Sequence, residues 1–61
     1  MTLEELIILA SKQSEKYLTV DKREFTIDLA FGNAHFDNYS LTREMVEEEY
    51  DKLVKEGEIN D

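Results

Sequence analysis

Apolar residues recur every three or four positions over the first part of the chain, which is the period of one helix face. Thr2 and Glu5 have the spacing of a capping box, in which each side chain bonds the other residue's backbone N–H. The pattern therefore predicts a first helix over about residues 3–17. Its buried face is expected to hold Leu3, Leu6, Ile7, Leu9, Ala10 and Tyr17, with Glu4, Ser11, Lys12 and Glu15 on the opposite face.

Ile8 does not fit this pattern, because its position places it among Glu4, Lys12 and Glu15. Single exposed apolar residues are common on protein surfaces and need no function. An exposed isoleucine can also belong to a contact with a second copy or with another protein. Both interpretations stay open, and Ile8 is a candidate partner-binding residue.

The middle of the chain carries two conflicting signals. Phe25, Ile27, Leu29 and Phe31 alternate with polar or small residues, which is the period of a strand, and Gly32-Asn33 could then form a two-residue hairpin turn. Such a hairpin would place Asp28 opposite Asp37, an unfavourable like-charge pair. An isolated two-stranded ribbon is also barely stable.

The helical interpretation of the same segment starts from Asp21 and Glu24, which have the spacing of a helix start. It predicts a second helix over about residues 22–34, ended by Gly32-Asn33. The apolar residues would then form two stripes, as expected for a central helix with a neighbour on each side. One stripe contains Phe25, Leu29 and Phe36, and the other contains Ile27, Ala30, Phe31 and Ala34. Helix is favoured over hairpin.

A third helix is predicted over about residues 43–56. Thr42 can cap its first turn, Leu41 and Val46 occupy the hydrophobic-staple positions, and Gly57 is suited to a left-handed stop. The residues after Gly57 should fray, unless Ile59 folds back onto the helix end. The buried stripe is expected to contain Val46, Tyr50, Leu53 and Val54, with Met45 on its edge, and Lys52 and Lys55 could pair with Glu48 and Asp51.

These elements predict a compact all-α three-helix domain, with an α-β-β-α fold containing a central hairpin as the alternative. The 61 residues make a single small domain, 1–61. A chain of this length buries only about 60% of the surface that its unfolded form exposes. It has no cysteine, so neither a disulfide nor a thiolate metal site can add stability. Helix packing, self-association or a partner must therefore supply the stability of the fold.

Composition argues against several classes of function. Fifteen acidic against seven basic residues give a net charge of −8, which disfavours direct binding to nucleic acid or anionic membranes. No apolar run approaches a membrane span and the N-terminal segment is acidic, so a cytoplasmic location is expected. His35 is the only histidine, and it has no nucleophile or metal-ligand motif around it. A surface or half-buried loop position is expected for it, and the chain is predicted to be a non-enzyme with no cofactor or metal.

Acidic residues gather on the third predicted helix. Such a face usually serves solubility, but it is also a candidate contact surface. Glu49 falls within the apolar arc, where an unpaired charge costs free energy. Asp28 is expected to cap a helix or to pair with Arg23 or Lys22. With Ile8, the candidate partner-binding residues are Glu44, Glu47, Glu48 and Asp51.

Three short segments together resemble a pattern in small, uncharacterised helical proteins encoded by phages and prophages. They are Lys22-Arg-Glu-Phe, Asp28-Leu-Ala-Phe-Gly-Asn33 and Leu41-Thr-Arg-Glu-Met-Val46. The resemblance spans roughly residues 22–55. The chain differs from the pattern in its very acidic last helix and in lacking Asn-Pro before Thr-Arg-Glu. The resemblance implies a helical accessory protein of phage type, in the host cytoplasm, with no particular activity.

Two hypotheses of function follow. The first is a non-enzymatic accessory or regulatory protein that acts by protein–protein interaction, with a homodimer as one form of it. The second is an acidic inhibitor that mimics nucleic acid and binds a host DNA- or RNA-binding enzyme. They differ in their response to salt, because charge-led binding weakens steeply as ionic strength rises.

Overall fold

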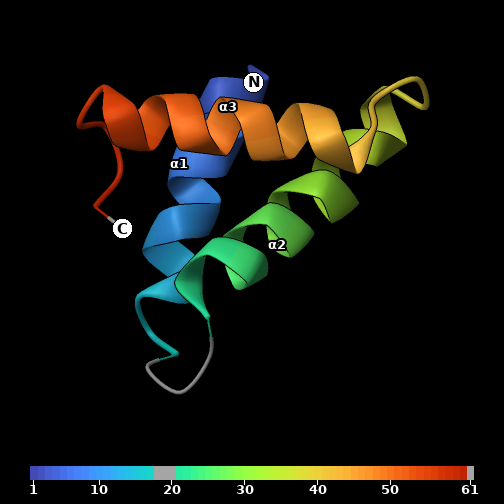
Figure 1. Ribbon diagram of the computed structural model, residues 1–61. Coiled ribbons are helices and arrows are strands. Elements are labelled where there is room, and N and C mark those ends of the chain that lie inside the picture. Colours follow the sequence, from blue (N-terminus) through green and yellow to red (C-terminus); the bar gives the residue numbers. More distant parts are fainter. Residues whose placement is uncertain (18–20, 61) are drawn as a thin grey trace.

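The computed structural model describes residues 1–17 and 21–60, and in these residues the chain forms three helices (Figure 1). They are α1 (Leu3–Ser14), α2 (Lys22–Asp37) and α3 (Arg43–Lys55). This confirms the compact all-α three-helix fold. The alternative with a central hairpin is wrong, because residues 22–37 form one continuous helix.

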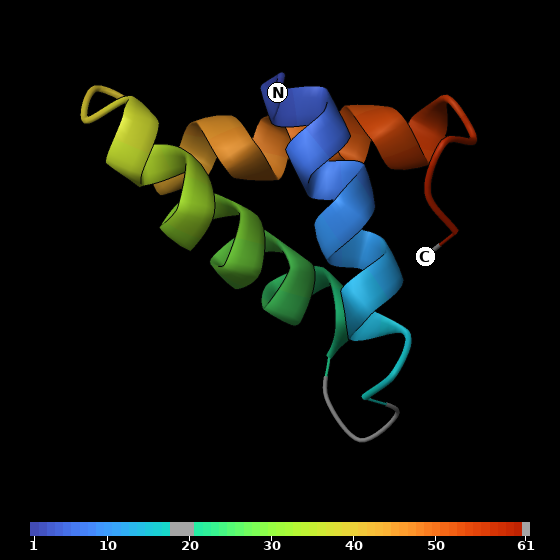
Figure 2. The ribbon, with the colours of Figure 1, turned by 180° about the vertical axis from the view of Figure 1, so that it is seen from behind.

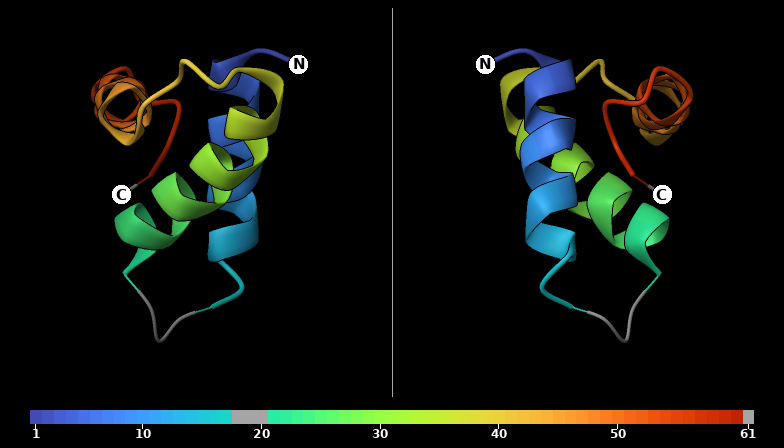
Figure 3. Two further views of the ribbon diagram at one scale, coloured as in Figure 1. Left: turned by 90° about the vertical axis from the view of Figure 1, so that its right-hand side faces the viewer. Right: turned by 90° about the vertical axis from the view of Figure 1, so that its left-hand side faces the viewer.

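The helices α1 and α2 run in opposite directions, and α3 lies across one side of this pair (Figures 1 and 2). The two side views agree, since α3 is seen end-on at one side of α1 and α2 (Figure 3). Both α1 and α2 contact α3, but they contact each other most extensively. The face of the α1/α2 pair that lies away from α3 is called the outer face below.

The core lies between the three helices and is centred on fully buried side chains. Tyr50, Leu53 and Val46 come from α3, and Ile7 and Ile27 come from α1 and α2. The predicted stripe of α3 is thus confirmed, with Val54 half-buried and Met45 exposed at its edge. The stripe Ile27, Ala30, Phe31 and Ala34 of α2 also faces the core.

The buried face of α1 differs from the prediction. Ser11, expected on the polar face, is buried, whereas Leu9, expected in the core, is 46% exposed. Ile8 is half-buried and packs against the core, so its predicted place among exposed side chains is wrong. Tyr17 is exposed and follows the helix, which ends at Ser14 rather than at residue 17. The side of α1 that carries Ser11 therefore faces the core, and the side that carries Leu9 faces solvent.

Small side chains at the contact with α2 explain this orientation of α1. The Ser14 hydroxyl donates to the Ser11 carbonyl oxygen at 2.8 Å, and the Thr26 hydroxyl donates to Ser14 Oγ at 3.0 Å. All three residues are buried. Because the Ser14 and Thr26 hydroxyls both have acceptors and all three side chains are small, α2 can pack closely on this side of α1. A leucine in the same place would hold the helices farther apart.

The second helix begins as predicted but ends later. The Asp21 carboxylate accepts from the Glu24 backbone N–H at 3.0 Å, which caps the helix. Gly32-Asn33 does not end the helix, because Gly32 does not adopt the positive φ of a helix stop. The Asn33 side-chain amide donates to the Leu29 carbonyl oxygen of the preceding turn at 2.7 Å. The end comes at Asp37, where Asn38 accepts through its side chain from the Ser40 N–H.

Both ends of α3 follow the sequence signals closely. Thr42 Oγ1 accepts from the Met45 N–H at 3.3 Å, and the staple residue Leu41 is buried. At the other end Gly57 has φ 81°, its N–H donates to the Val54 carbonyl, and the next N–H donates to the Leu53 carbonyl. This is the Schellman arrangement, so the predicted left-handed stop is confirmed. The helix itself ends at residue 55, one residue before the predicted end.

The segment after Gly57 is held against the fold. Ile59 is buried, as expected if it folds back, and the Lys22 ammonium donates to the Asn60 carbonyl oxygen. The prediction that this tail frays is therefore wrong for residues 58–60, because an apolar anchor and a contact to α2 fix it.

The two glycines predict stability changes of opposite sign. Gly32→Ala should stabilise the monomer by about 1 kcal/mol, because alanine favours helix and, apart from the chain neighbours and the backbone of its own helix, no described atom lies within 4 Å of the added Cβ. Gly57→Ala should destabilise it by about 1 kcal/mol, because alanine is strained at positive φ. Urea unfolding at low protein concentration measures both. Equal signs for the two variants would contradict this assignment.

Candidate functional site: an outer groove between two helices

An apolar groove of about 390 Å³ opens on the outer face, between α1 and α2. Figure 2 shows this side, with α1 and α2 in front and α3 behind them. We call it the outer groove. It is lined by Leu6, Leu9, Ala10, Gln13 and Tyr17 from the first helix and its following turn, and by Phe25, Leu29 and Asn33 from α2.

The floor and walls of the outer groove are mainly apolar and partly open to solvent. The rings of Tyr17 and Phe25 meet at one end with centroids 5.2 Å apart. Phe36 follows Leu29 by seven residues, so it continues the same face of α2 by two turns, and it is 76% exposed. The groove therefore contains Phe25 and Leu29 of the α2 stripe that the sequence predicts to pack against a neighbour, and Phe36 continues this stripe beyond the groove lining.

A second, smaller groove of about 330 Å³ lies near the N-terminus. Met1, Leu3 and Leu6 line it from one side, and Leu41 and Met45 line it from the other. Its wall also includes the polar end of α2, with Asp37 and Asn38. Because its lining is more polar, it is a weaker candidate for an apolar contact.

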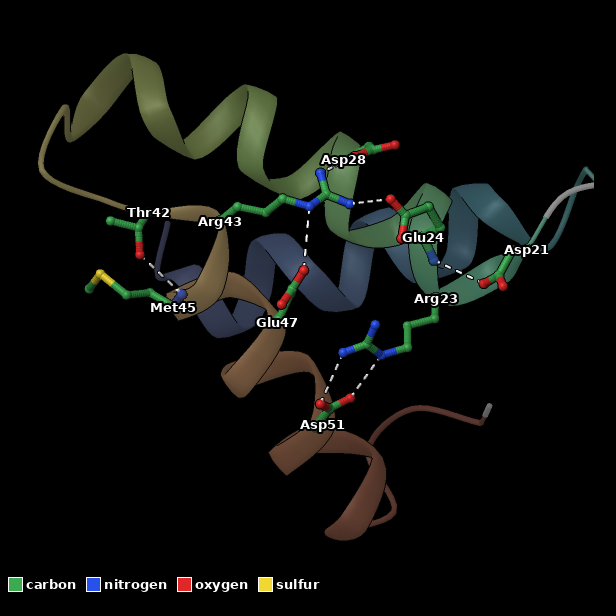
Figure 4. Close-up of polar contacts among 9 residues, drawn as sticks. All are labelled: Asp21, Arg23, Glu24, Asp28, Thr42, Arg43, Met45, Glu47 and Asp51. Atoms are coloured by element: carbon green, nitrogen blue, oxygen red, sulfur yellow. Dashed lines mark hydrogen bonds and ion pairs between the residues drawn. The ribbon is translucent and has the colours of Figure 1, made fainter.

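The other chemically distinctive region is a set of ion pairs between α2 and α3 (Figure 4). Arg23 donates to both carboxylate oxygens of Asp51 at 3.1 Å. Arg43 pairs with Asp28, with Glu24 at 2.5 Å and with Glu47 at 3.4 Å. Two arginines therefore hold four carboxylates at the junction of the two helices.

These contacts shift the titration of the groups involved. The hydrogen bonds from Arg23 lower the pKa of Asp51, and its positive charge adds to this effect. The same contact raises the pKa of Arg23. Hydrogen bonding to Asp28 raises the pKa of Arg43, and the nearby Glu24 carboxylate contributes as well. Such pairs are partly exposed, so each adds little stability.

The ion pairs redefine the acidic cluster of the third helix. Asp51 pairs with Arg23, and Glu47 shares Arg43 with Asp28 and Glu24, whereas Glu44 and Glu48 are exposed without an ion pair among the described residues. Glu49 is half-buried without an ion pair to any described residue.

Two predicted sets of ion pairs differ from those observed. Asp28 pairs with Arg43, rather than with Arg23 or Lys22. Asp51 pairs with Arg23 on α2, and no pair of Lys52 or Lys55 with Glu48 or Asp51 forms. The sequence spacing could not show these contacts, because they join different helices.

His35 lies half-buried on α2, not in a loop. Its imidazole stacks on Phe31 with centroids 5.2 Å apart and meets the Tyr39 ring edge-on at 5.4 Å. These contacts use the imidazole as an aromatic packing group. Among residues 1–17 and 21–60, no group of three or more His, Asp or Glu side chains could hold a metal ion.

No known protein family, curated protein or solved structure matches the chain. In the described part of the chain, none of the helices combines the length and apolar character that crossing a bilayer requires.

The predicted site residues do not form one surface. Ile8 packs against the core, and the four acidic candidates lie on α3, two of them in ion pairs. The outer groove was not predicted as a site, although its signal was present in the second apolar stripe of α2. Leu9 gave no such signal, because helical spacing alone assigned it to the core.

The Arg23–Asp51 contact predicts a pH-dependent contribution to stability. The pKa of Asp51 is lower in the folded chain, so the contribution is present above the ordinary carboxyl pKa of about 4 and is lost as pH falls through the folded value. Arg23→Gln should cost about 0.5 kcal/mol at pH 7, and this difference from wild type should shrink as pH falls through the lowered pKa of Asp51.

Urea unfolding across this pH range is the measurement. Lys55→Gln is the matched control, because it removes the same charge from an exposed lysine with no ion pair among the described residues. An Arg23→Gln effect that equals the control at every pH would contradict the proposed contribution.

Proposed function

We propose that this chain is a non-enzymatic accessory or regulatory protein, of the phage type that the resemblance implies, and that it acts by binding a protein through the outer groove. The observation that carries the proposal is the uncovered apolar stripe of α2. Phe25 and Leu29 are half-buried and Phe36 is largely exposed, although all three lie on one helix face.

The size of the chain strengthens this argument. Small soluble monomers rarely leave a contiguous apolar surface open unless it contacts something. Here Leu9, Tyr17 and Phe36 are all exposed on or beside one groove. A helix with an apolar face is a typical occupant of a groove between two helices.

The alternative proposal is an acidic inhibitor that mimics nucleic acid. The net charge of −8 and the exposed Glu44 and Glu48 support it. The pairing of Asp51 with Arg23 and of Glu47 with Arg43 weighs against it, because a paired carboxylate presents less negative charge to a basic enzyme. Protein binding through the outer groove is therefore preferred.

A capture experiment separates the two proposals. The tagged chain is exposed to a lysate of its source cells at about 0.1 M and about 0.5 M NaCl, and bound proteins are identified. Binding through the outer groove should persist at high salt and be lost with Leu9→Glu, because a charge then enters the apolar contact. It should be retained with the double variant Glu44→Gln, Glu48→Gln.

The opposite pattern would support the mimic. In that case capture would fall steeply with salt, survive Leu9→Glu and be lost when Glu44 and Glu48 are neutralised. Circular dichroism of each variant checks that the fold is retained. A chain that binds no protein, including no second copy of itself, at either salt concentration would overturn both proposals.

A further inference from the structure

We infer that the outer groove is covered by a second copy of this chain, so that two α1/α2 pairs pack face to face with α3 on the outside of each. This inference rests on the proposed function, because it names the occupant of the same groove. Three observations lead to it: the charges beside the groove, an unexplained glycine and the uncovered stripe of α2.

The charges beside the outer groove complement one another across a two-fold axis. Lys12 follows Leu9 by three residues near the end of α1, and Lys16 lies in the turn that follows the helix, next to the groove residue Tyr17. Both lysines therefore lie beside this end of the groove. Asp21 precedes Phe25 by four residues and borders it at the start of α2. All three charges are exposed, and none has an ion pair among the described residues. The groove thus has a basic and an acidic border at the same end.

A two-fold axis parallel to the helices would bring these borders together. It places α1 of one copy over α2 of the other, with the C-terminal end of each α1 and the N-terminal end of each α2 on the same side. The lysines of each copy then face Asp21 of the other copy. The helix α3, with five acidic and three basic residues, lies on the opposite side of each pair, so its net negative charge stays away from the contact (Figure 3).

Gly32 marks a place where another backbone or side chain can approach closely. It lies in the interior of α2, where glycine destabilises a helix, and a Cβ there would meet nothing within 4 Å. It follows Asp28 by four and precedes Phe36 by four, so it belongs to the exposed side of the helix. The fold of one chain gives no reason for this glycine. A second copy packed against α2 gives one, because the missing side chain leaves room for an apolar group such as its Leu9.

The uncovered stripe completes the argument. The sequence predicts a neighbour on each side of α2. Within one chain, the stripe with Ile27 packs in the core, whereas the stripe with Phe25 and Leu29 meets only the edge of α1. In the paired arrangement, α1 of the second copy covers Phe25, Leu29 and Phe36. Each α2 then has the two neighbours that its pattern requires.

Analytical ultracentrifugation tests the inference. The purified chain is measured from about 5 to 500 µM, at about 0.1 M and 0.5 M NaCl. We expect a monomer–dimer equilibrium that persists at high salt. Leu9→Glu should raise the dissociation constant at least about tenfold. Met45→Glu is the matched control, because Met45 is 47% exposed against 46% for Leu9 but lies outside the outer groove, and it should leave the constant unchanged.

Gly32→Ala is the most decisive variant, because it should stabilise the folded monomer and weaken the dimer. It should raise the melting temperature of the dilute monomer and also weaken the dimer at least about tenfold, because the added methyl group fills the space needed by the second copy. If the variant is more stably folded and yet associates more weakly, the loss of association cannot be caused by unfolding.

The outcomes separate this inference from the proposed function. A monomer at every concentration, or a dimer unaffected by both Leu9→Glu and Gly32→Ala, would overturn the inference. If that monomer still captured another protein in a Leu9-dependent way, the proposed function would stand with a different occupant. If it captured none, both would fail.

Discussion

The contact between α1 and α2 through small side chains determines most of the other features. Ser14 and Thr26 are hydrogen bonded across it, and Ser11 accepts from Ser14 within α1. To bury these residues, α1 turns Ile7 into the core and Leu9 to the outer face. The same side of the pair then receives α3, and the opposite side is left with the outer groove. The apolar surface of the outer groove is thus a consequence of the hydroxyl contact between Ser14 and Thr26.

The position of α3 is fixed by two kinds of interaction. Its apolar stripe enters the core through Tyr50 and Leu53, which supplies most of the free energy of docking. Arg23 on α2 adds a directional contact with Asp51, and Arg43 on α3 adds contacts with Asp28 and Glu24 of α2. These contacts are modest in energy because they are partly exposed. These pairs also place the acidic helix where its charge does not surround the outer groove. Stability and the distribution of charge therefore arise from the same contacts.

Local sequence signals predicted the elements well and their contacts poorly. The caps at Thr2, Asp21 and Thr42 and the stop at Gly57 depend on neighbours within a few residues, so the sequence determines them directly. The pairing of Arg43 with Asp28 and the burial of Ser11 depend on how helices cross. A helical wheel shows which residues share a face, but it cannot show which part of that face another helix will cover.

Gly32 and Gly57 show where this limit lies. The same local rule predicts a helix end at both, and it succeeds only at Gly57, where φ is positive and two backbone hydrogen bonds complete the stop. At Gly32 the residues up to Asp37 continue the helix, so glycine costs stability there without ending anything. A destabilising residue in open space requires an explanation outside the fold of one chain. Because it lies on the exposed side of α2, close to the uncovered stripe, the explanation consistent with the rest of the surface is close packing by a second molecule.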